Sequence, residues 1–189
     1  MRQRIYDAAE ICDDQNMYYF GTLNSDDRKG VIPGWTSYFM PSSKLGVMRD
    51  NWSENAVSAF FRGRTGLSHS HADVNQMLMY AYGRYLLADT GMNSYDARDP
   101  YYIWQSKRTE SHNTVEINEK GQEKSGAVNT TMYTNPRMDF YTGESYAYPD
   151  FVHTRKAAFA KNDKFFIISD FIKAPQDGSV NTFNQTWHN

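Results

Sequence analysis

The sequence predicts a mainly β, antiparallel fold preceded by a short N-terminal helix. In the first twenty residues, Ile5, Ala8, Ala9 and Ile11 recur among charged residues with the spacing of an amphipathic helix. After Pro33 the apolar residues occur instead in short runs that are typical of strands. The 189 residues include 40% hydrophobic and 15% aromatic residues, enough to bury one full-sized core and hardly two. We therefore expect one β domain after the helix.

A tight hairpin is the first clear strand pair. Residues 76–82 and 85–89 are rich in aromatic and aliphatic side chains, and Gly83-Arg84 divides them. Asp89 closes the second run directly after three apolar residues. A carboxylate in that position is costly to bury unless it is paired, hydrogen-bonded or bound to a metal.

The remaining strands are predicted further along the chain. His112 precedes a strand at residues 114–117, and later strands are expected at residues 157–160, 165–168 ending at Asp170, and 182–187. The polar stretch 121–135, rich in Thr, Asn and Gly, is predicted to be a loop. His153 follows a tyrosine-rich loop and has no obvious partner, so we expect a solvated surface histidine.

Four residues form the candidate site: His69, His71, Asp89 and His112. On a strand, His69 and His71 would project from the same side and share one site. Two imidazoles and one carboxylate with an open fourth position are a common ligand set for catalytic zinc. Taken singly, His71 and His112 are more often hydrogen-bonded interior histidines and Asp89 more often caps a turn. It is their combination that indicates metal or catalytic chemistry.

A non-haem iron site is the alternative. His71-x-Asp73 with a distal histidine matches the two-histidine, one-carboxylate triad of iron oxygenases. That triad uses Asp73 in place of Asp89. On a regular strand Asp73 shares the face of His71, so strand geometry alone leaves both ligand sets open.

Several short motifs, in order along most of the chain, resemble those of the heparinase II/III-like family of polysaccharide lyases. They are Met48-Arg49 followed by Trp52, His69-Ser70-His71-Ala72-Asp73, Tyr82-Gly83-Arg84, Leu87-Ala88-Asp89-Thr90-Gly91, Tyr95, Arg108, His112-Asn113-Thr114-Val115 and Gln122. The resemblance implies an antiparallel, supersandwich-like β-sandwich. By motif position it implies that His69 is catalytic and that His71, Asp89 and His112 hold a Zn2+ ion. The wider motif match also favours a lyase over an oxygenase.

The family further implies how the chain is organised. Its lyases carry a helical toroid before the sandwich, so residues 1–25 are expected to be the remnant of that domain with a linker. Residues 26–189 are expected to be the sandwich domain, truncated at its C-terminus. The implied reaction is β-elimination in uronic-acid-containing glycans such as heparin, heparan sulfate or alginate. Because the toroid supplies the acid/base tyrosine and the group that neutralises the uronate, we expect the fragment alone to be inactive.

Candidate substrate-binding residues accompany the metal ligands in the sequence. Aromatic faces stack on sugar rings, and a guanidinium can hold a carboxylate or sulfate in a forked contact. On these grounds, and from the family motifs, the candidates are Tyr95, Tyr101, Tyr102, Trp104, Arg108, Asn113 and Gln122. The alternative is that the tyrosines pack the loop and that Arg108 pairs with a nearby acid.

Charge and composition restrict the partners. The net charge of −2, from 20 basic and 22 acidic residues without a basic stripe, argues against nucleic acid. No apolar run reaches membrane length and no signal-peptide pattern begins at Met1, so a periplasmic or secreted location is expected only for the parent protein. Cys12 is the single cysteine, which excludes an internal disulfide.

The resemblance to the lyase family implies an anionic polysaccharide as the partner. The last predicted strand, residues 182–187, would leave an unpaired apolar sheet edge that favours a homodimer. A non-catalytic, metal-stabilised sandwich that binds glycan is the alternative function, because the fragment would lack the toroid.

Overall fold

The computed structural model describes residues 2–22, 26, 29–64, 71–91, 94, 96, 98–102, 108–123 and 128–189. It divides into two compact units, Met1–Thr36 and Ser37–Asn189. The expected boundary between residues 25 and 26 stays a prediction. Among the described residues, no helix has the length and hydropathy needed to cross a membrane.

The first unit contains two short helices where the sequence predicted one. Helix α1 spans Arg2–Cys12 and helix α2 spans Gln15–Gly21. They are separated because Asp13 adopts a left-handed backbone conformation with φ 51°, which cannot continue a right-handed helix. The Asp14 carboxylate then begins α2 by accepting hydrogen bonds from the backbone N–H groups of Asn16 (2.8 Å) and Met17 (2.9 Å).

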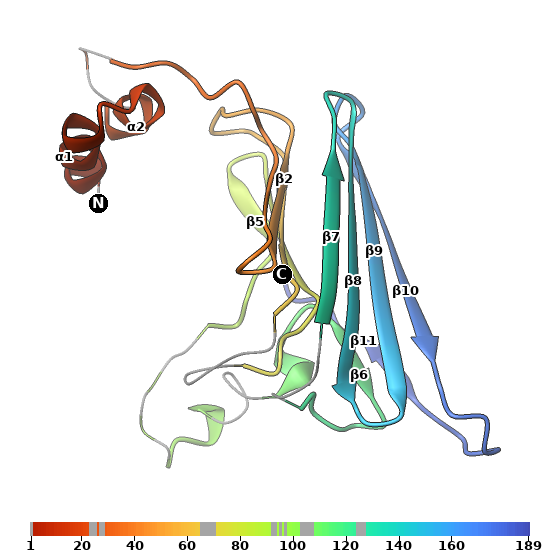
Figure 1. The fold of residues 1–189 in the computed structure, drawn as a ribbon. Helices are drawn as coiled ribbons and strands as arrows, with labels where there is room; N and C mark the ends of the chain where they lie inside the picture. Colours follow the sequence, from red (N-terminus) through yellow and green to blue (C-terminus); the bar gives the residue numbers. More distant parts are fainter. Residues whose placement is uncertain are drawn as a thin grey trace. The chain divides into compact units, whose positions relative to one another are not determined.

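Two antiparallel sheets form most of the second unit (Figure 1). The five-stranded sheet has the order β1-β2-β3-β4-β5, and its strands are Tyr38–Met40, Leu45–Arg49, Ser58–Arg62, Gln76–Ala81 and Arg84–Leu87. The four-stranded sheet has the order β10-β9-β8-β7, and its strands from β7 to β10 are Val128–Thr134, Met138–Tyr148, Phe151–Ala160 and Phe165–Lys173. Each strand pairs with its neighbour in the sequence, as expected for short hairpin connections.

A third, two-stranded sheet pairs β6 (Val115–Ile117) with β11 (Phe183–Gln185). A short 3-10 helix, η1 (Thr109–Ser111), immediately precedes β6. The strand predicted at residues 182–187 is thus confirmed as a three-residue strand. Its partner β6 follows the candidate ligand His112, so this small sheet brings the C-terminal residues to the candidate site.

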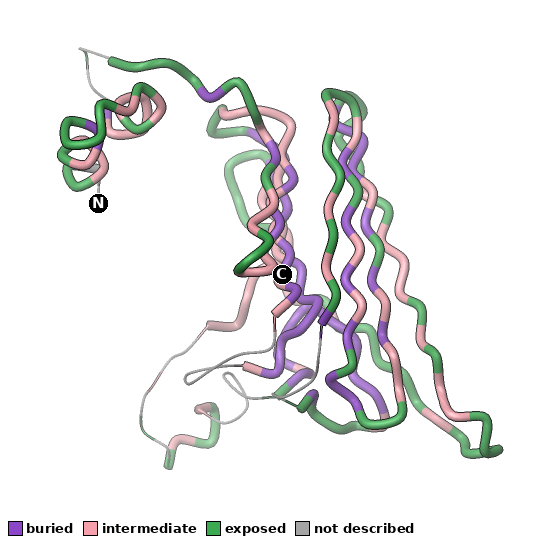
Figure 2. Tube along the Cα trace, in the orientation of Figure 1, coloured by how far each residue is buried: buried purple, intermediate pink, exposed green. Residues whose placement is uncertain are grey.

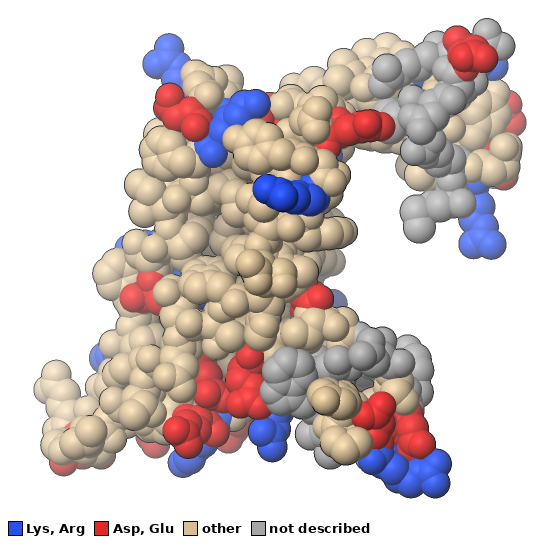
Figure 3. All heavy atoms as spheres, turned by 180° about the vertical axis from the view of Figure 1, so that it is seen from behind, with Lys and Arg blue, Asp and Glu red and all other residues tan. Residues whose placement is uncertain are grey.

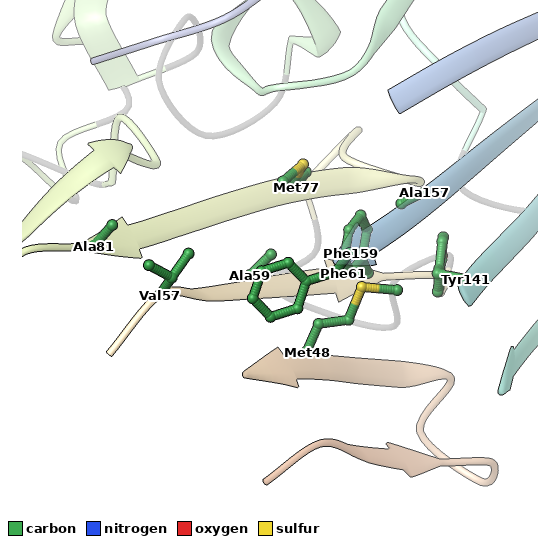
Figure 4. Close-up of a cluster of buried hydrophobic side chains, with 9 residues drawn as sticks. All are labelled: Met48, Val57, Ala59, Phe61, Met77, Ala81, Tyr141, Ala157 and Phe159. Carbon is green, nitrogen blue, oxygen red and sulfur yellow. The ribbon is translucent and has the colours of Figure 1, made fainter. Parts of the chain in front are cut away.

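The main core lies between the two larger sheets. One cluster of buried side chains combines residues on or beside β2, β3 and β4 with residues of β8 and β9: Met48, Val57, Ala59, Phe61, Met77, Ala81, Tyr141, Ala157 and Phe159 (Figure 4). Across the interface, the rings of Phe61 and Tyr141 stack with centroids 4.5 Å apart. Buried positions alternate with more exposed ones along β8 and β9 (Figure 2). Two sheets that share one inner core form a β-sandwich, which confirms the predicted fold class.

The predicted hairpin is also confirmed, with its turn shifted by one residue. Strands β4 and β5 are joined by Tyr82 and Gly83, whose φ angles of 54° and 79° are both left-handed. Two consecutive left-handed residues give the type I′ turn that matches the twist of paired strands. The sequence placed the break at Gly83-Arg84, but Arg84 is already the first residue of β5.

The loop predicted at residues 121–135 is wrong for its second half. Residues 128–134 form β7, which pairs with β8 from Val128↔Ser145 to Thr134↔Asp139. Strand β7 lies at the edge of its sheet and exposes most of its residues. A strand with a solvated face can carry Thr and Asn there, so its composition resembles that of a loop.

Candidate metal centre

Three predicted ligands converge in the second unit. His71, Asp89 and His112 each offer one ligand atom, and these atoms all lie within 4.8 Å of one another. His112 Nδ1 lies 3.0 Å from Asp89 Oδ2, and the rings of His71 and His112 have centroids 5.2 Å apart. His71 precedes β4, Asp89 follows β5, and His112 lies between η1 and β6. The β4–β5 hairpin therefore brings two of the ligands together, and the β6 region supplies the third.

His71 differs from the prediction in its backbone. It lies in an irregular segment before β4 and not on a strand. Asn75, four residues later, has a left-handed φ of 61°, which turns the chain sharply before β4 begins. His69 lies outside the described residues, so the shared side of His69 and His71 stays a prediction.

Asp89 is a firmly held carboxylate. Its Oδ2 accepts a hydrogen bond from Gln76 Nε2 (2.7 Å), and its Oδ1 accepts one from the backbone N–H of Gly91 (2.7 Å). Partial burial alone would raise the pKa of Asp89, but the hydrogen bonds from His112, Gly91 and Gln76 hold that pKa well below its usual range. The residue is thus anionic near neutral pH and suited to bind a cation.

His112 carries the clearest sign that the cluster accommodates an additional group. The side chain is fully buried, and its Nε2 has no hydrogen-bond partner among the residues that the structure describes. A buried polar atom without a partner is destabilising, and a metal ion or an ordered water would relieve that cost. Burial, together with the neighbouring His112, lowers the pKa of His71 and favours its neutral, metal-binding form. Two imidazoles and one carboxylate fit zinc in donor type and in number.

The segment that carries His71 is fixed by two buried side chains. The Gln122 Oε1 atom accepts a hydrogen bond from the backbone N–H of Val74 (2.7 Å), and its Nε2 atom donates one to the Val74 carbonyl (3.1 Å). Thr114 Oγ1 donates to the same carbonyl (2.7 Å). Because Thr114 follows His112 closely in the chain, these bonds tie two ligand-bearing segments to each other.

Asn113 joins the segments that carry Asp89 and His112 in a similar way. Its Nδ2 donates to the Ala88 carbonyl (2.8 Å), and its Oδ1 accepts from the backbone N–H of His188 (2.6 Å). The backbone N–H of Ala88 in turn donates to the His188 carbonyl (2.9 Å). Residues adjoining Asp89 and His112 are thus joined both directly and through the C-terminal segment.

The candidate substrate-binding residues have different positions. Asn113 and Gln122 are buried and use their side-chain amides inside the protein, so in this structure they brace the segments that carry the candidate ligands. Arg108 is exposed and pairs with Glu110 at 3.1 Å, a solvated ion pair that leaves the guanidinium accessible. Tyr95 and Trp104 lie outside the described residues.

Asp73, the carboxylate of the iron alternative, is oriented toward another partner. Its Oδ2 lies 3.2 Å from Arg62 Nη1, and the side chain is buried. Burial raises the pKa of Asp73, and Arg62 partly opposes this shift. Among the described residues, the cluster with metal-ligand spacing contains Asp89 and not Asp73.

The prediction for His153 is wrong, and two neighbours of this residue were missed. His153 is fully buried, and its Nε2 lies 2.8 Å from Asp170 Oδ1. Arg155 is also fully buried and contacts both oxygens of Asp170. The signal was present in the alternation of β9, because His153 and Arg155 share the inward parity of Ala157 and Phe159.

On the face drawn in Figure 3, acidic and basic side chains of the described residues lie interspersed. Such a surface offers no extended basic stripe among the side chains drawn. An anionic glycan would have to be bound by a small number of local cations such as Arg108.

Comparisons with known proteins identify the family of this chain. The family model for the heparinase II/III-like C-terminal domain matches residues 33–189. A heparin-sulfate lyase of Bacteroides stercoris is 24% identical over 166 residues, which cover 86% of this chain and 25% of the relative. A heparin-sulfate lyase of Bacteroides thetaiotaomicron is 25% identical over 154 residues, which cover 80% of this chain and 20% of the relative. The chain therefore spans a quarter or less of the length of these curated relatives.

Solved structures share the fold. A heparinase III gene product superposes with a TM-score of 0.82 at 23% identity, over 92% of this chain and 27% of that chain. The heparan sulfate lyase of Pedobacter heparinus superposes with a TM-score of 0.79 at 21% identity, over 89% of this chain and 26% of that chain. Because the family model covers most of the sequence, the chain belongs to the heparinase II/III-like family, where it matches the C-terminal domain.

Proposed function

We propose that this chain is the sandwich part of a polysaccharide lyase that cleaves a uronic-acid-containing glycan by β-elimination, with Zn2+ held by His71, Asp89 and His112. The observation that carries the proposal is the convergence of these three side chains, whose ligand atoms all lie within 4.8 Å of one another. Family membership supports the lyase class, and the names of the curated relatives support heparin or heparan sulfate over alginate.

The zinc ion has a mainly structural role in this proposal. When bound, it would cross-link the segment before β4, the end of β5 and the start of β6, and so fix the direction of the chain at His71. His71, Asp89 and His112 are the ligands. His69, two residues before a ligand, is thereby held toward the sugar and takes part in proton transfer or in neutralising the uronate carboxylate.

The reaction needs three groups acting on one sugar ring. A base removes the proton at C5, the electron pair forms the C4–C5 double bond, and the C4–O bond to the leaving sugar breaks. An acid protonates the departing oxygen, while a neutralising group stabilises the charge that develops on the carboxylate. The chain supplies His69 for one of these tasks. We propose that the rest of a longer, periplasmic or secreted protein supplies the others, so this chain alone should not turn over substrate.

Elemental analysis of the purified chain tests the metal assignment. We expect up to one zinc per chain and loss of zinc in His71→Ala and Asp89→Ala. Asp73→Asn is the matched control, because it removes a buried carboxylate near the site that pairs with Arg62. Retention of zinc by both ligand variants would overturn the ligand set. Loss of metal in Asp73→Asn alone, with iron in place of zinc, would favour the oxygenase.

Absorbance of the conjugated double bond tests the reaction in the longer protein, on heparan sulfate with alginate as the comparison. Formation of unsaturated uronate from heparan sulfate would support the proposed class and substrate. Glycan binding without any product would favour the non-catalytic glycan-binding sandwich. Turnover by the present chain alone would contradict the division of catalytic groups proposed above.

A further inference from the structure

A buried arginine connects the two sheets of the sandwich to the metal centre. Arg155 lies on β9 with no exposed surface. Its Nε and Nη2 donate to Asp170 Oδ1 (2.8 Å) and Oδ2 (2.9 Å), a forked pair across directly opposed residues of β9 and β10. His153 and Gln185 add contacts to the same carboxylate at 2.8 and 2.5 Å. The guanidinium therefore has a fixed position and orientation.

The remaining nitrogen of this guanidinium points away from Asp170. Arg155 Nη1 donates to the carbonyl of Asn75 (2.8 Å) and to the carbonyl of Asn113 (2.6 Å). Asn75 immediately precedes Gln76, which donates to Asp89. Asn113 immediately follows His112. One nitrogen atom therefore bridges the segment that carries His71 and Gln76 to the segment that carries His112.

Both bridged segments are held at these positions by other contacts as well. Asn75 Nδ2 donates to the Gly143 carbonyl (2.9 Å), so its segment is also attached to β8. The ring of Trp187 lies over the guanidinium, 5.0 Å from its carbon atom, and covers it from the side of the C-terminal segment. Without Arg155, two buried carbonyls and the Asp170 carboxylate would lose their common donor.

We propose that Arg155 is a positioning residue of the metal centre, which sets the distance between His112 and the hairpin that carries Asp89. The inference rests on the proposed zinc site and concerns residues that do not touch the metal. A guanidinium suits this role because it donates to the carboxylate and to the two carbonyls in one plane. A lysine ammonium at the same place keeps the charge but cannot reproduce this geometry.

Zinc affinity of the folded chain tests the proposal. Competition with a chromophoric chelator should show Kd raised about 10- to 100-fold in Arg155→Lys, the scale of a lost residue that orients metal ligands. The affinity is measured at a temperature at which circular dichroism shows each apo-protein to be folded. A residue that only stabilised the sandwich would lower the unfolding midpoint and leave Kd of the folded chain unchanged.

Two further variants keep the result decisive. Asp139→Asn is the matched control, because it breaks another buried ion pair of the same sheet, with Lys161 at 2.9 Å, and should lower stability without changing Kd. Arg155→Gln combined with Asp170→Asn removes both charges and avoids an unpaired one, so it should fold even where Arg155→Lys does not. We expect weakened zinc binding in this double variant too. If the folded Arg155 variants bind zinc with the affinity of the wild-type chain, the role of Arg155 is wrong but the zinc site stands. If the wild-type chain binds no zinc, both the zinc site and the role of Arg155 are wrong.

Discussion

Replacing Asp170 by asparagine should reveal how strongly the sandwich depends on its buried ion pair. The carboxylate is 9% exposed and accepts hydrogen bonds from Arg155, His153 and Gln185, so solvent screens it little. Removing one partner of such a pair costs about 3–5 kcal/mol, because the other charge stays buried. Asparagine keeps one acceptor oxygen, which places the expected loss near the lower end of that range. For a chain of this size the loss corresponds to a fall in Tm of about 6–12 °C.

The pH dependence of the same variant provides the sharper test. Burial would raise the pKa of Asp170, but His153 and Arg155 hold it well below its usual range. The stabilisation by a carboxylate with a depressed pKa is complete above its unfolded pKa of about 3.9 and is lost as the pH falls below that value. Asparagine does not titrate, so the stability difference between the parent chain and Asp170→Asn should shrink as the pH is lowered from about 6 to about 3.

Urea unfolding with chelator present, followed by circular dichroism across this pH range, measures the difference without a contribution from zinc. Asp163→Asn is the matched control, since Asp163 lies exposed in the turn between β9 and β10 and should change stability by about 0.5 kcal/mol or less. A difference for Asp170→Asn that stays constant across the pH range would refute the argument.

Four other outcomes are expected. Phe159→Ala should lower the free energy of unfolding by about 3–5 kcal/mol in urea titrations, because the ring is fully buried and stacked on Phe166. A loss under about 1 kcal/mol would contradict the core assignment. Addition of zinc at about 100 times its Kd should stabilise the wild-type chain by about 2.7 kcal/mol in calorimetry and leave the stability of His71→Ala unchanged. Equal stabilisation of both proteins would exclude His71 as a ligand. Asn113→Ala should weaken zinc binding in chelator competition, because it removes the side-chain hydrogen bonds to Ala88 and His188 that join the residues next to Asp89 and His112. An unchanged zinc affinity would contradict that role. In the longer protein, His69→Ala should lower kcat about 100-fold or more with zinc content unchanged, and loss of metal would make His69 a ligand instead.

The sequence was sufficient to predict the features that depend on local pattern. The β4–β5 hairpin followed from two apolar runs divided by glycine, and it was confirmed because a turn and a strand end are specified within a few residues. The proposed ligands came from the His69-x-His71 pair and from polar residues next to strands. The structure brings His71, Asp89 and His112 together, and their binding of a metal stays a prediction.

The features that depend on distant partners were missed. Strand β7 has the composition of a loop, and only its pairing with β8 makes it a strand. His153 and Arg155 are polar residues that are buried against Asp170, which lies opposite Arg155 on the next strand. Asn113 and Gln122 were selected from motif positions as sugar contacts, yet their amides bind backbone groups of Ala88 and Val74. A single sequence shows which residues are polar but not which buried groups will satisfy them.

The contact between His188 and the residues beside Asp89 and His112 has a consequence for biosynthesis. His71, Asp89 and His112 leave the ribosome well before Gln185, Trp187 and His188, which complete the bracing of the same centre. A nascent chain that has emerged only as far as β10 therefore contains the three proposed ligands but lacks the contacts made by Gln185, Trp187 and His188. Zinc captured at that stage would bind a looser arrangement, and tight binding would develop only when the last strand pairs with β6. We therefore expect the zinc affinity of the proposed site to rise when β11 has paired with β6.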